Sequence, residues 1–532
     1  MRHALAVASA LALLAAGCGT PTDPEGWAKR AVSRARTDEK LEAVGKVRAL
    51  LGKDKDGKAL ATPEQRRAAV DPLGELLKDK QVPAKVRAEA AVALGEIGDT
   101  RAVKGLLDAI DPSPRDRDAS DLNRRIADAL GTLKATEAVP ALEALAKSGD
   151  GYTQIAAVDA LGKIGDPAAV DTLADIANDP KSEPFTARKA ILAIGQIGDD
   201  DKHLGRAAVL KAIFSPRGLF NEASFATYQL GKVMAEPLLA VLEGKDAELA
   251  AWAKEQGVPP GALAAKASQL LGDVGGADAV PVLVSKLSYT DPEPEVTRVV
   301  RVFVADALAR LRAKEAVRPV GDLAAAEKDP LVRERYCGAL ARIGDPAALP
   351  ALRAMAASAG SAELRLAPLV AISRLGGKDD RAAVEAARAK DCPENKCASE
   401  GIKGAYDGML ARLDAAGACG ADAACWEKKL EDPSAAVRDR AALEVGAAGK
   451  AKQAPALAAA VARPVNGDAD VDARFHAVLA LKWVLAREPI GPAGAELAGR
   501  IDAVLASDRG RTLTAGVNED ALRVATVLRR GK

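Results

Sequence analysis

Apolar residues between positions 86 and 110 follow the spacing of two successive amphipathic helices. In the first segment they lie on one helix face, at Val86, Ala90, Ala93, Leu94 and Ile97. In the second segment a similar face is formed by Val103, Leu106, Leu107 and Ile110. A glycine and an aspartate separate the two segments. The pattern therefore predicts a pair of short helices joined by a tight turn.

The turn is encoded by the glycine and the aspartate together. Glycine readily adopts the left-handed conformation that ends a helix, and an aspartate can accept hydrogen bonds from the free N–H groups of the next helix. In two other copies a proline follows, at Pro167 and Pro346, and the first position of a helix tolerates it. We assign helix-turn and capping roles to four such pairs: Gly98 and Asp99, Gly165 and Asp166, Gly198 and Asp199, and Gly344 and Asp345.

The arrangement recurs along the chain. The triplet Ala-Leu-Gly, or a close relative, starts at positions 93, 129, 160, 193, 229 and 270, and subtraction gives spacings of 31 to 41 residues. A period of this length is typical of helical repeat arrays. One helix pair buries too little apolar surface to offset the entropy of ordering it, so the pairs should stack. The triplet's glycine would let a neighbouring helix approach closely.

These repeats resemble the HEAT-like repeats of the phycobilisome-lyase type, whose pattern is close to VRxxAAxALGxIGDxxAVxxLxxAL. The segment VRAEAAVALGEIGDTRAVKGLLDAI matches this pattern nearly throughout, and VRERYCGALARIGDPAALPAL is close to it. The resemblance covers about residues 86–457 and implies an all-α fold, an α-α superhelix of antiparallel helix pairs as in HEAT-like and armadillo-type solenoids. It also implies ladders between the turn aspartates and first-helix arginines such as Arg87, Arg188 and Arg333.

The regularity of the repeat suggests how the chain is divided. We expect divergent N-terminal helical units over residues 27–80 and regular repeats over 81–390. A cysteine-containing insertion should follow over 391–426, and then divergent C-terminal repeats and a cap over 427–532. Residues 18–26 are rich in Gly, Pro and Thr, which predicts a flexible tether.

Residues 1–17 predict a lipoprotein signal peptide. Arg2 precedes a charge-free apolar stretch that is too short to span a bilayer as a helix but is typical of a secretory signal. The ending LLAAGC resembles the bacterial lipobox, with Ala15 where leucine is commonest. In that family the peptide is cut before the cysteine, which is then acylated, so Cys18 is the predicted lipidation site. The alternative is an ordinary signal peptide with an incidental cysteine.

This leader predicts a lipid-anchored protein of the bacterial cell envelope rather than a cytoplasmic one. Two or more acyl chains hold a protein stably at a membrane. Gly19 does not match the aspartate-type signal for retention at the inner membrane, so we favour the outer membrane.

Four cysteines cluster in the segments CPENKC and CGADAAC. Export would permit disulfides, and Pro393 and Gly420 break the helical path so that sequence neighbours can meet. We expect the bonds Cys392–Cys397 and Cys419–Cys425. Crossed pairs and a four-cysteine zinc site are the alternatives. Cys337 lies inside a repeat helix and is expected to be a buried small apolar residue.

Composition narrows the function classes. Apolar residues make up 48% of the chain and aromatic residues only 3%, which suits close-packed helices better than β-sandwiches. The chain has 75 basic and 74 acidic residues, so its net charge is close to zero. The sequence also lacks the basic stripe that is typical of nucleic-acid binding, so we expect no nucleic-acid partner.

Candidate catalytic groups are scarce. Outside the leader the chain has only two histidines. We expect His203 to be solvated and His476 to be packed in a helix. Deoxyhypusine hydroxylase, an enzyme of similar HEAT-like architecture, needs several His-Glu pairs for its di-iron centre, and this sequence has none. Phosphate-loop, dinucleotide and metalloprotease motifs are also missing. We therefore expect no catalytic residue, metal or cofactor.

The sequence favours a non-enzymatic envelope lipoprotein that acts as a scaffold and offers its curved face to another protein. Two alternatives remain. One is an enzyme similar to the phycobilin lyases that attaches or detaches a chromophore, and the other is a purely structural spacer.

Overall fold

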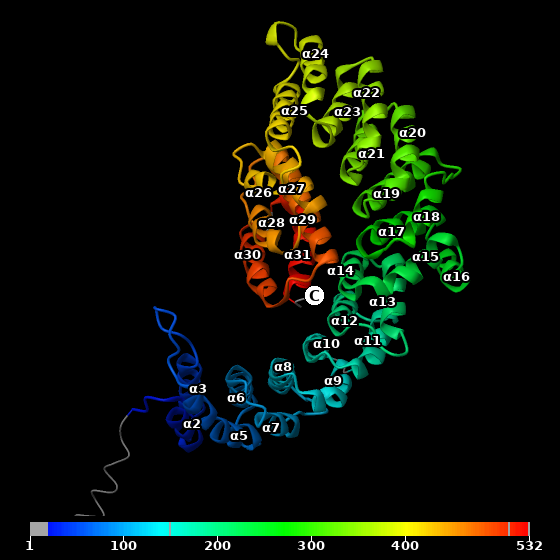
Figure 1. Ribbon diagram of the computed structural model, residues 1–532. Coiled ribbons are helices and arrows are strands. Elements are labelled where there is room, and N and C mark those ends of the chain that lie inside the picture. Colours follow the sequence, from blue (N-terminus) through cyan, green and yellow to red (C-terminus); the bar gives the residue numbers. More distant parts are fainter. Residues whose placement is uncertain (1–19, 148–149, 509–510, 530–532) are drawn as a thin grey trace, which may run out of the picture. The chain divides into compact units, whose positions relative to one another are not determined.

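The computed structural model describes residues 20–147, 150–508 and 511–529. This part of the chain is helical and contains no β-strand, only one isolated bridge between Lys53 and Ala59. The chain divides into two compact units, Met1–Ala212 (unit 1) and Ile213–Lys532 (unit 2). Each unit is a stack of helix pairs (Figure 1), so the predicted all-α superhelix of paired helices is confirmed.

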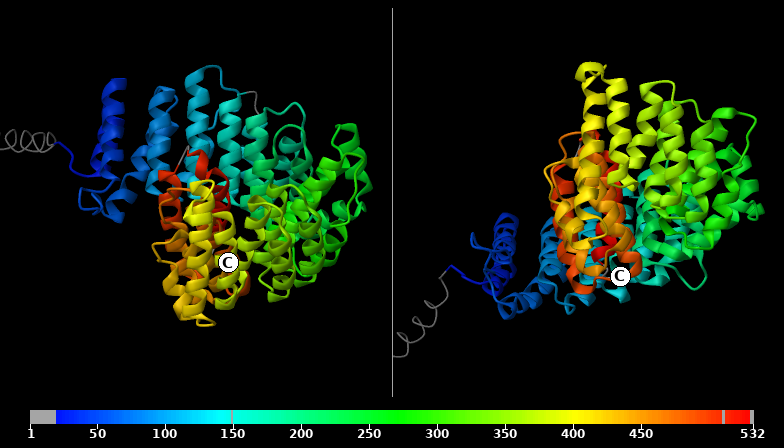
Figure 2. Two further views of the ribbon diagram at one scale, coloured as in Figure 1. Left: turned by 90° about the horizontal axis from the view of Figure 1, so that it is seen from above. Right: turned by 45° about the horizontal axis from the view of Figure 1, so that its top comes forward.

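The first helices of the pairs in unit 1 stand side by side in chain order (Figure 2). They are α3 (Thr37–Leu50), α6 (Ala84–Ile97), α8 (Arg117–Leu133), α10 (Gly151–Ile164) and α12 (Pro184–Ile197). Shorter helices accompany them: α2 (Pro24–Ser33), α4 (Pro63–Ala68), α5 (Val70–Lys78), α7 (Ala102–Asp108), α9 (Val139–Ala146) and α11 (Val170–Asn178). Helix α13 (Leu204–Phe214) contains the boundary between the units.

The start of α2 corrects the predicted tether. The helix begins at Pro24, so the last three residues of the segment 18–26 are helical. Asp23 accepts a hydrogen bond from the N–H of Gly26 at 2.8 Å, and Pro24 takes the first helical position; both features start a helix. The predicted signal peptide (1–17) and Cys18 lie outside the described residues.

The first helices of unit 2 also contact one another in chain order, and the last of them, α31, contacts the first, α14. The row in unit 2 therefore closes on itself. Its members are α14 (Phe220–Leu230), α17 (Pro260–Val274), α19 (Pro294–Arg310), α21 (Pro330–Ile343), α23 (Ala362–Leu375), α25 (Glu400–Cys419), α27 (Ala435–Ala448), α29 (Asp468–Arg487) and α31 (Ala515–Arg529).

The remaining helices of unit 2 connect these first helices. They are α15 (Ala235–Glu243), α16 (Ala247–Glu255), α18 (Ala279–Lys286), α20 (Val317–Ala326), α22 (Leu349–Ser358), α24 (Arg381–Asp391), α26 (Ala423–Lys429), α28 (Ala454–Val461) and α30 (Gly494–Ser507). In both units a 3-10 turn leads into several of the connecting helices, as at Pro167–Ala169 before α11 in unit 1 and Pro346–Ala348 before α22 in unit 2.

Helix α25 corrects the predicted insertion over residues 391–426. It packs between α23 and α27, as the other first helices pack between their neighbours. Tyr406, Met409, Leu413 and Ala416 are buried at helical spacing along one side of it. The segment is therefore a divergent repeat that carries two cysteine-containing turns.

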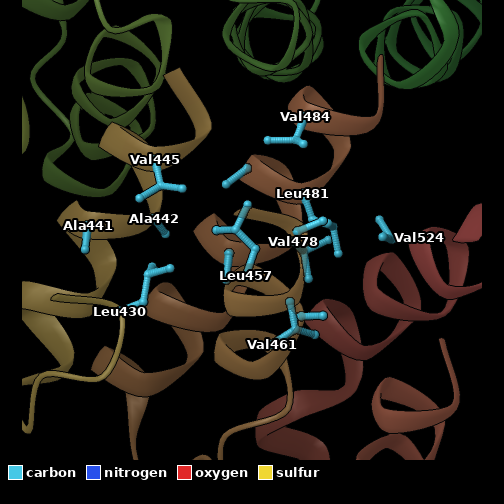
Figure 3. Close-up of a cluster of buried hydrophobic side chains, with 14 of the residues drawn as sticks. Leu430, Ala441, Ala442, Val445, Leu457, Val461, Val478, Leu481, Val484 and Val524 are labelled. Carbon is cyan, nitrogen blue, oxygen red and sulfur yellow. The ribbon is translucent and has the colours of Figure 1, made fainter. Parts of the chain in front are cut away.

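Small and aliphatic side chains fill the core, as the low aromatic content predicts. Figure 3 shows part of one cluster in unit 2, where Leu457, Val478 and Leu481 pack together from α28 and α29. Val524 of α31 joins the same cluster, so the last first helix shares the core of the repeats before it.

The glycine of the Ala-Leu-Gly triplet allows close helix contact, as predicted. A Cβ atom added at Gly95 would lie 3.0 Å from both the Cα and the Cβ of Ala129, and one at Gly131 would lie 2.8 Å from the Cα of Ala160. Real Cβ atoms are rarely this close to another helix. The alanine of one triplet thus receives the glycine of the preceding triplet. The same contact joins Gly162 to Ala193, Gly272 to Ala307 and Gly446 to Ala480.

Three of the four predicted turns share one geometry. Gly98, Gly165 and Gly344 end their helices with φ of 77°, 79° and 75°, in the left-handed region. Asp99, Asp166 and Asp345 then accept hydrogen bonds from the N–H groups two residues on, at 3.0, 3.0 and 2.9 Å.

The fourth turn differs. Gly198 has φ 109° and ψ −167°, and Asp200, not Asp199, accepts from the N–H groups of Leu204 and Gly205 at the start of α13. Asp199 instead lies 3.0 Å from Nδ1 of His203. An additional aspartate in this turn shifts the capping role by one residue.

Arg87 and Arg333 do not form the ladders that the family resemblance implies. Nε of Arg87 donates to the carbonyl of Val82 at 3.2 Å, and Nε of Arg333 donates to the carbonyl of Glu327 at 3.0 Å. From the first turn of a helix, an arginine reaches the loop that ends the preceding helix, where carbonyl groups lack helical partners. These arginines therefore fix the entry into their own helix.

Candidate binding cavity in unit 2

Four first helices of unit 2 carry a charged residue directly after the triplet position. Their side chains are 5%, 12%, 13% and 10% exposed, in the order Asp273, Arg310, Arg342 and Arg374. A buried charge requires a partner, because desolvation costs several kcal/mol per ion. Two clusters of opposite charges supply these partners.

The Asp273 cluster joins α17, α19, α21, α29 and α31. Arg310 lies 3.1 Å from Asp273, 2.8 Å from Asp306 and 3.6 Å from Asp520. The other cations that pair with these carboxylates are Lys482, Arg342 and Arg523. Burial alone would raise the pKa of Asp273, but Lys482 and Arg310 outweigh it and hold that pKa below its ordinary value.

The Asp439 cluster joins α23, α25, α27 and α29. Asp439 is fully buried and lies 2.8 Å from Arg374 and 2.7 Å from Arg412, and it also contacts Nδ1 of His476. Burial lowers the pKa of His476 below its ordinary value, although Asp439 acts in the opposite direction. The neutral ring then donates from Nδ1 to Asp439, and its Nε2 is buried without a hydrogen-bond partner. The predicted packed position of His476 is confirmed.

Hydrogen bonds from the same region hold the row of first helices closed. Nε1 of Trp483 donates to the carbonyl of Arg310 at 2.8 Å, and Arg523 donates to Oγ of Ser224 at 2.9 Å. These partners are 173 and 299 residues apart in sequence. Sequence reasoning missed them because a repeat pattern specifies contacts between neighbouring pairs only.

A cavity of about 770 Å³ lies beside the Asp273 cluster, at the ends of α17 and α19 and along α29. Its volume falls in the range of about 300–1,000 Å³ that is typical of small-molecule sites. The apolar part of its lining includes Val274, Val280, Leu479, Trp483, Leu485 and Val527. The charged part consists of Lys232, Arg310, Arg312 and Lys482 with Asp273 and Glu315.

Arg312 has an unusual backbone conformation. Its φ of 54° lies in the left-handed region, and it occupies the position that Gly344 takes one repeat later. Its Nε donates to the carbonyl of Ile343 at 3.4 Å, and its guanidinium lies 5.2 Å from the ring centroid of Trp483. Burial and the nearby Arg487 lower the pKa of Arg312. An arginine in the glycine position is the sequence signal that would have identified this residue.

The cysteines follow the predicted local pairing. Disulfide bonds join Cys392 to Cys397 and Cys419 to Cys425. This pairing excludes the crossed bonds and the four-cysteine zinc site. Asp422 caps the short helix that contains Cys425, as expected. Cys337 is fully buried, and burial raises the pKa of its thiol to about 12.

The described residues form neither a metal cluster nor a membrane span. No group of three or more His, Cys, Asp or Glu side chains in the described ranges could hold a metal ion. Likewise, none of the helices described has the length and apolar character needed to cross a membrane.

A family model of HEAT repeats matches residues 57–122, 115–190 and 297–373. These residues contain HEAT repeats. No curated protein matches the sequence.

Several solved structures are similar to this chain at low identity. A mutant of the karyopherin Kap121p is 12% identical, with 91% of this chain and 55% of that chain covered and a TM-score of 0.48. Importin beta in an ammonium sulfate condition is 13% identical over 95% of this chain and 74% of that chain, with a TM-score of 0.36. Human deoxyhypusine hydroxylase in complex with glycerol is 20% identical over 58% of this chain and 96% of that chain, with a TM-score of 0.22.

Proposed function

We propose that this chain is a non-enzymatic scaffold of the bacterial cell envelope, anchored by lipid at Cys18, and that another protein binds to the first helices of unit 1. The observation that carries the proposal is an uncovered helix face. The residue after the triplet is exposed in four successive first helices of unit 1, at Glu96, Thr132, Lys163 and Gln196.

The uncovered face carries charged residues whose ion pairs contribute little stability. Arg48 of α3 lies 2.8 Å from Glu89 and 2.7 Å from Glu96, and Lys189 of α12 lies 3.2 Å from Asp159. Exposed ion pairs of this kind contribute about 0–1 kcal/mol each. A partner can therefore exchange them for its own charges at little cost.

Two exposed aromatic side chains give this face its strongest candidate contacts. Tyr152 is 77% exposed and Phe185 is 49% exposed, and both stand at the second position of adjacent first helices, α10 and α12. Each lies eleven residues before the position after the triplet, which places it on the same side of its helix. Large aromatic residues contribute disproportionately to protein–protein affinity.

The leader and the cysteines support the envelope location. Disulfides persist mainly in oxidising compartments, and this chain forms two of them. Replacing Cys18 with serine should abolish metabolic labelling by palmitate and release the protein from the membrane fraction. Retained labelling in C18S would contradict the lipid anchor.

Site-specific photocrosslinking in cells tests the docking face. A benzophenone amino acid placed at Tyr152 or Phe185 should capture the same protein. Leu331 is the matched control, because it is 72% exposed and occupies the same helix position in α21 of unit 2. Capture from all three positions alike, or from none, would contradict docking at this face. A visible absorbance band on the purified protein would instead favour the chromophore lyase.

A further inference from the structure

We propose that the cavity of unit 2 binds an amphipathic monocarboxylate, with an apolar body against Trp483 and a carboxylate at Arg312. This site is separate from the proposed docking face. It is built entirely from residues of unit 2, and Trp483 and Arg312 contact each other in its wall.

The apolar wall suits a chain-like or aromatic body. Val274 and Val280 come from α17 and α18, Leu479 and Leu485 come from α29, and Val527 comes from α31. These residues line one continuous cavity with the Trp483 ring. Ligand sites typically combine such a wall with a few placed polar groups.

Among the lining cations, Arg312 and the exposed Lys232 make no ion pair within the described residues, and Arg312 is the one that lies against the Trp483 ring. Arg310 and Lys482 also line the cavity, but both are paired with Asp273. Arg312 makes no ion pair with any carboxylate of the described residues, although Glu444 attracts it through space. Its guanidinium lies against the Ile343 carbonyl, Gly344 and the Trp483 ring. Its neighbour Arg487, which donates to the carbonyls of Gly446 and Gly449, adds further positive potential.

The backbone of Arg312 supports a role for its side chain. Glycine takes the equivalent position in other repeats without strain, whereas a non-glycine residue in the left-handed region costs about 1–3 kcal/mol. Such strained residues cluster at functional sites. Lys134 has the same strain in unit 1, with φ of 52°, and does not line this cavity. Lys134 is therefore a natural control.

The remaining charges define the class of ligand. The planar guanidinium pairs well with a carboxylate. Asp273 is already paired with Arg310 and Lys482, so the unpaired lining charges are Arg312, Lys232 and Glu315. Two positive charges and one negative charge leave a net charge of +1, which favours one negative charge on the ligand over the two of a phosphate monoester. A free fatty acid and the C-terminus of an apolar peptide share this chemistry.

Binding is tested with a dansylated undecanoic acid as the fluorescent probe and the purified mature chain. Excitation of tryptophan should produce dansyl emission that saturates at one probe per chain, and decanoate should displace the probe. Decanol, which has the same body without the charge, should compete about 10- to 100-fold more weakly. An apolar peptide with a free C-terminus competes only if the site accepts chain ends, and its amidated form serves as the control for that arm.

Two matched variants decide the outcome. Arg312→Gly places the residue of the other repeats at this turn, so the fold should be kept, as thermal unfolding will verify, while the probe Kd rises about 10- to 100-fold. Lys134→Gly relieves the same strain elsewhere and should leave the Kd unchanged. Equal competition by decanol and decanoate, unchanged binding in R312G, or equal losses in both variants would overturn the proposal. None of these results bears on photocrosslinking at Tyr152 and Phe185.

Discussion

Successive first helices of unit 1 and of unit 2 treat the same repeat position in opposite ways. The residue after the triplet is exposed in α6, α8, α10 and α12 of unit 1, as at Glu96 and Lys163. In α17, α19, α21 and α23 of unit 2 it is largely buried, as at Arg310 and Arg342, whereas Lys232 before them is exposed. In unit 2 the late helices α29 and α31 supply Lys482, His476 and Arg523 to this region. The repeat therefore determines how neighbouring helices pair, and residues far along the chain determine whether a face stays open.

The largest expected effect is the loss of the Asp439 carboxylate. Asp439→Ala leaves Arg374 and Arg412 buried without it, which should lower the free energy of unfolding of unit 2 by about 3–5 kcal/mol. The matched change in unit 1, Asp159→Ala, removes the half-exposed partner of Lys189 and should cost less than about 1 kcal/mol. Urea unfolding followed by circular dichroism measures both. Equal costs would mean that the Asp439 cluster does not differ from a surface ion pair.

The glycine contacts should behave alike in the two units. Gly131→Ala and Gly272→Ala each place a methyl group 2.8 Å from a neighbouring Cα atom, so each should destabilise its unit by about 1–3 kcal/mol. Gly45→Ala is the control, because this helical glycine of α3 has open space around it and should gain up to about 1 kcal/mol from helix propensity. Thermal unfolding distinguishes these signs. Stabilisation by either contact variant would refute close packing as the reason for the triplet.

Features that depend on short-range sequence patterns could be predicted, whereas long-range contacts could not. The paired helices, the turns at Gly98 and Gly344 and the two disulfides depend on short-range patterns, and they were predictable for that reason. The closure of unit 2 depends on Trp483 reaching Arg310, and no local pattern encodes that contact. Two signals were nevertheless present in the sequence: charged residues at one repeat position of successive helices, and an arginine where other repeats have glycine.

His476 should make unit 2 sensitive to pH. Its pKa is lowered in the folded state, so below about pH 6.5 the unfolded chain binds a proton that the folded unit does not. Stability is therefore complete above that pH and falls as the pH drops from about 6.5 toward the folded-state pKa, with a limiting slope of about 1.4 kcal/mol per pH unit. The groups facing the ring are Asp439, Arg374 and Arg342. Urea midpoints measured across this range should drop for the native chain and drop less for His476→Gln; identical slopes would contradict a neutral buried ring.

The smallest effect concerns the two strained turns, one in each unit. Lys134→Gly should stabilise unit 1 by about 1 kcal/mol, because glycine removes the left-handed strain and the exposed Lys134 has no ion pair among the described residues to lose. Arg312→Gly relieves the same strain but gives up the hydrogen bond to Ile343 and the contact with Trp483, so unit 2 should gain less or nothing. Differential scanning calorimetry of both variants measures the difference. A larger gain from R312G than from K134G would mean that the Arg312 contacts contribute no stability, and the strain there would then lack any compensation in the free protein.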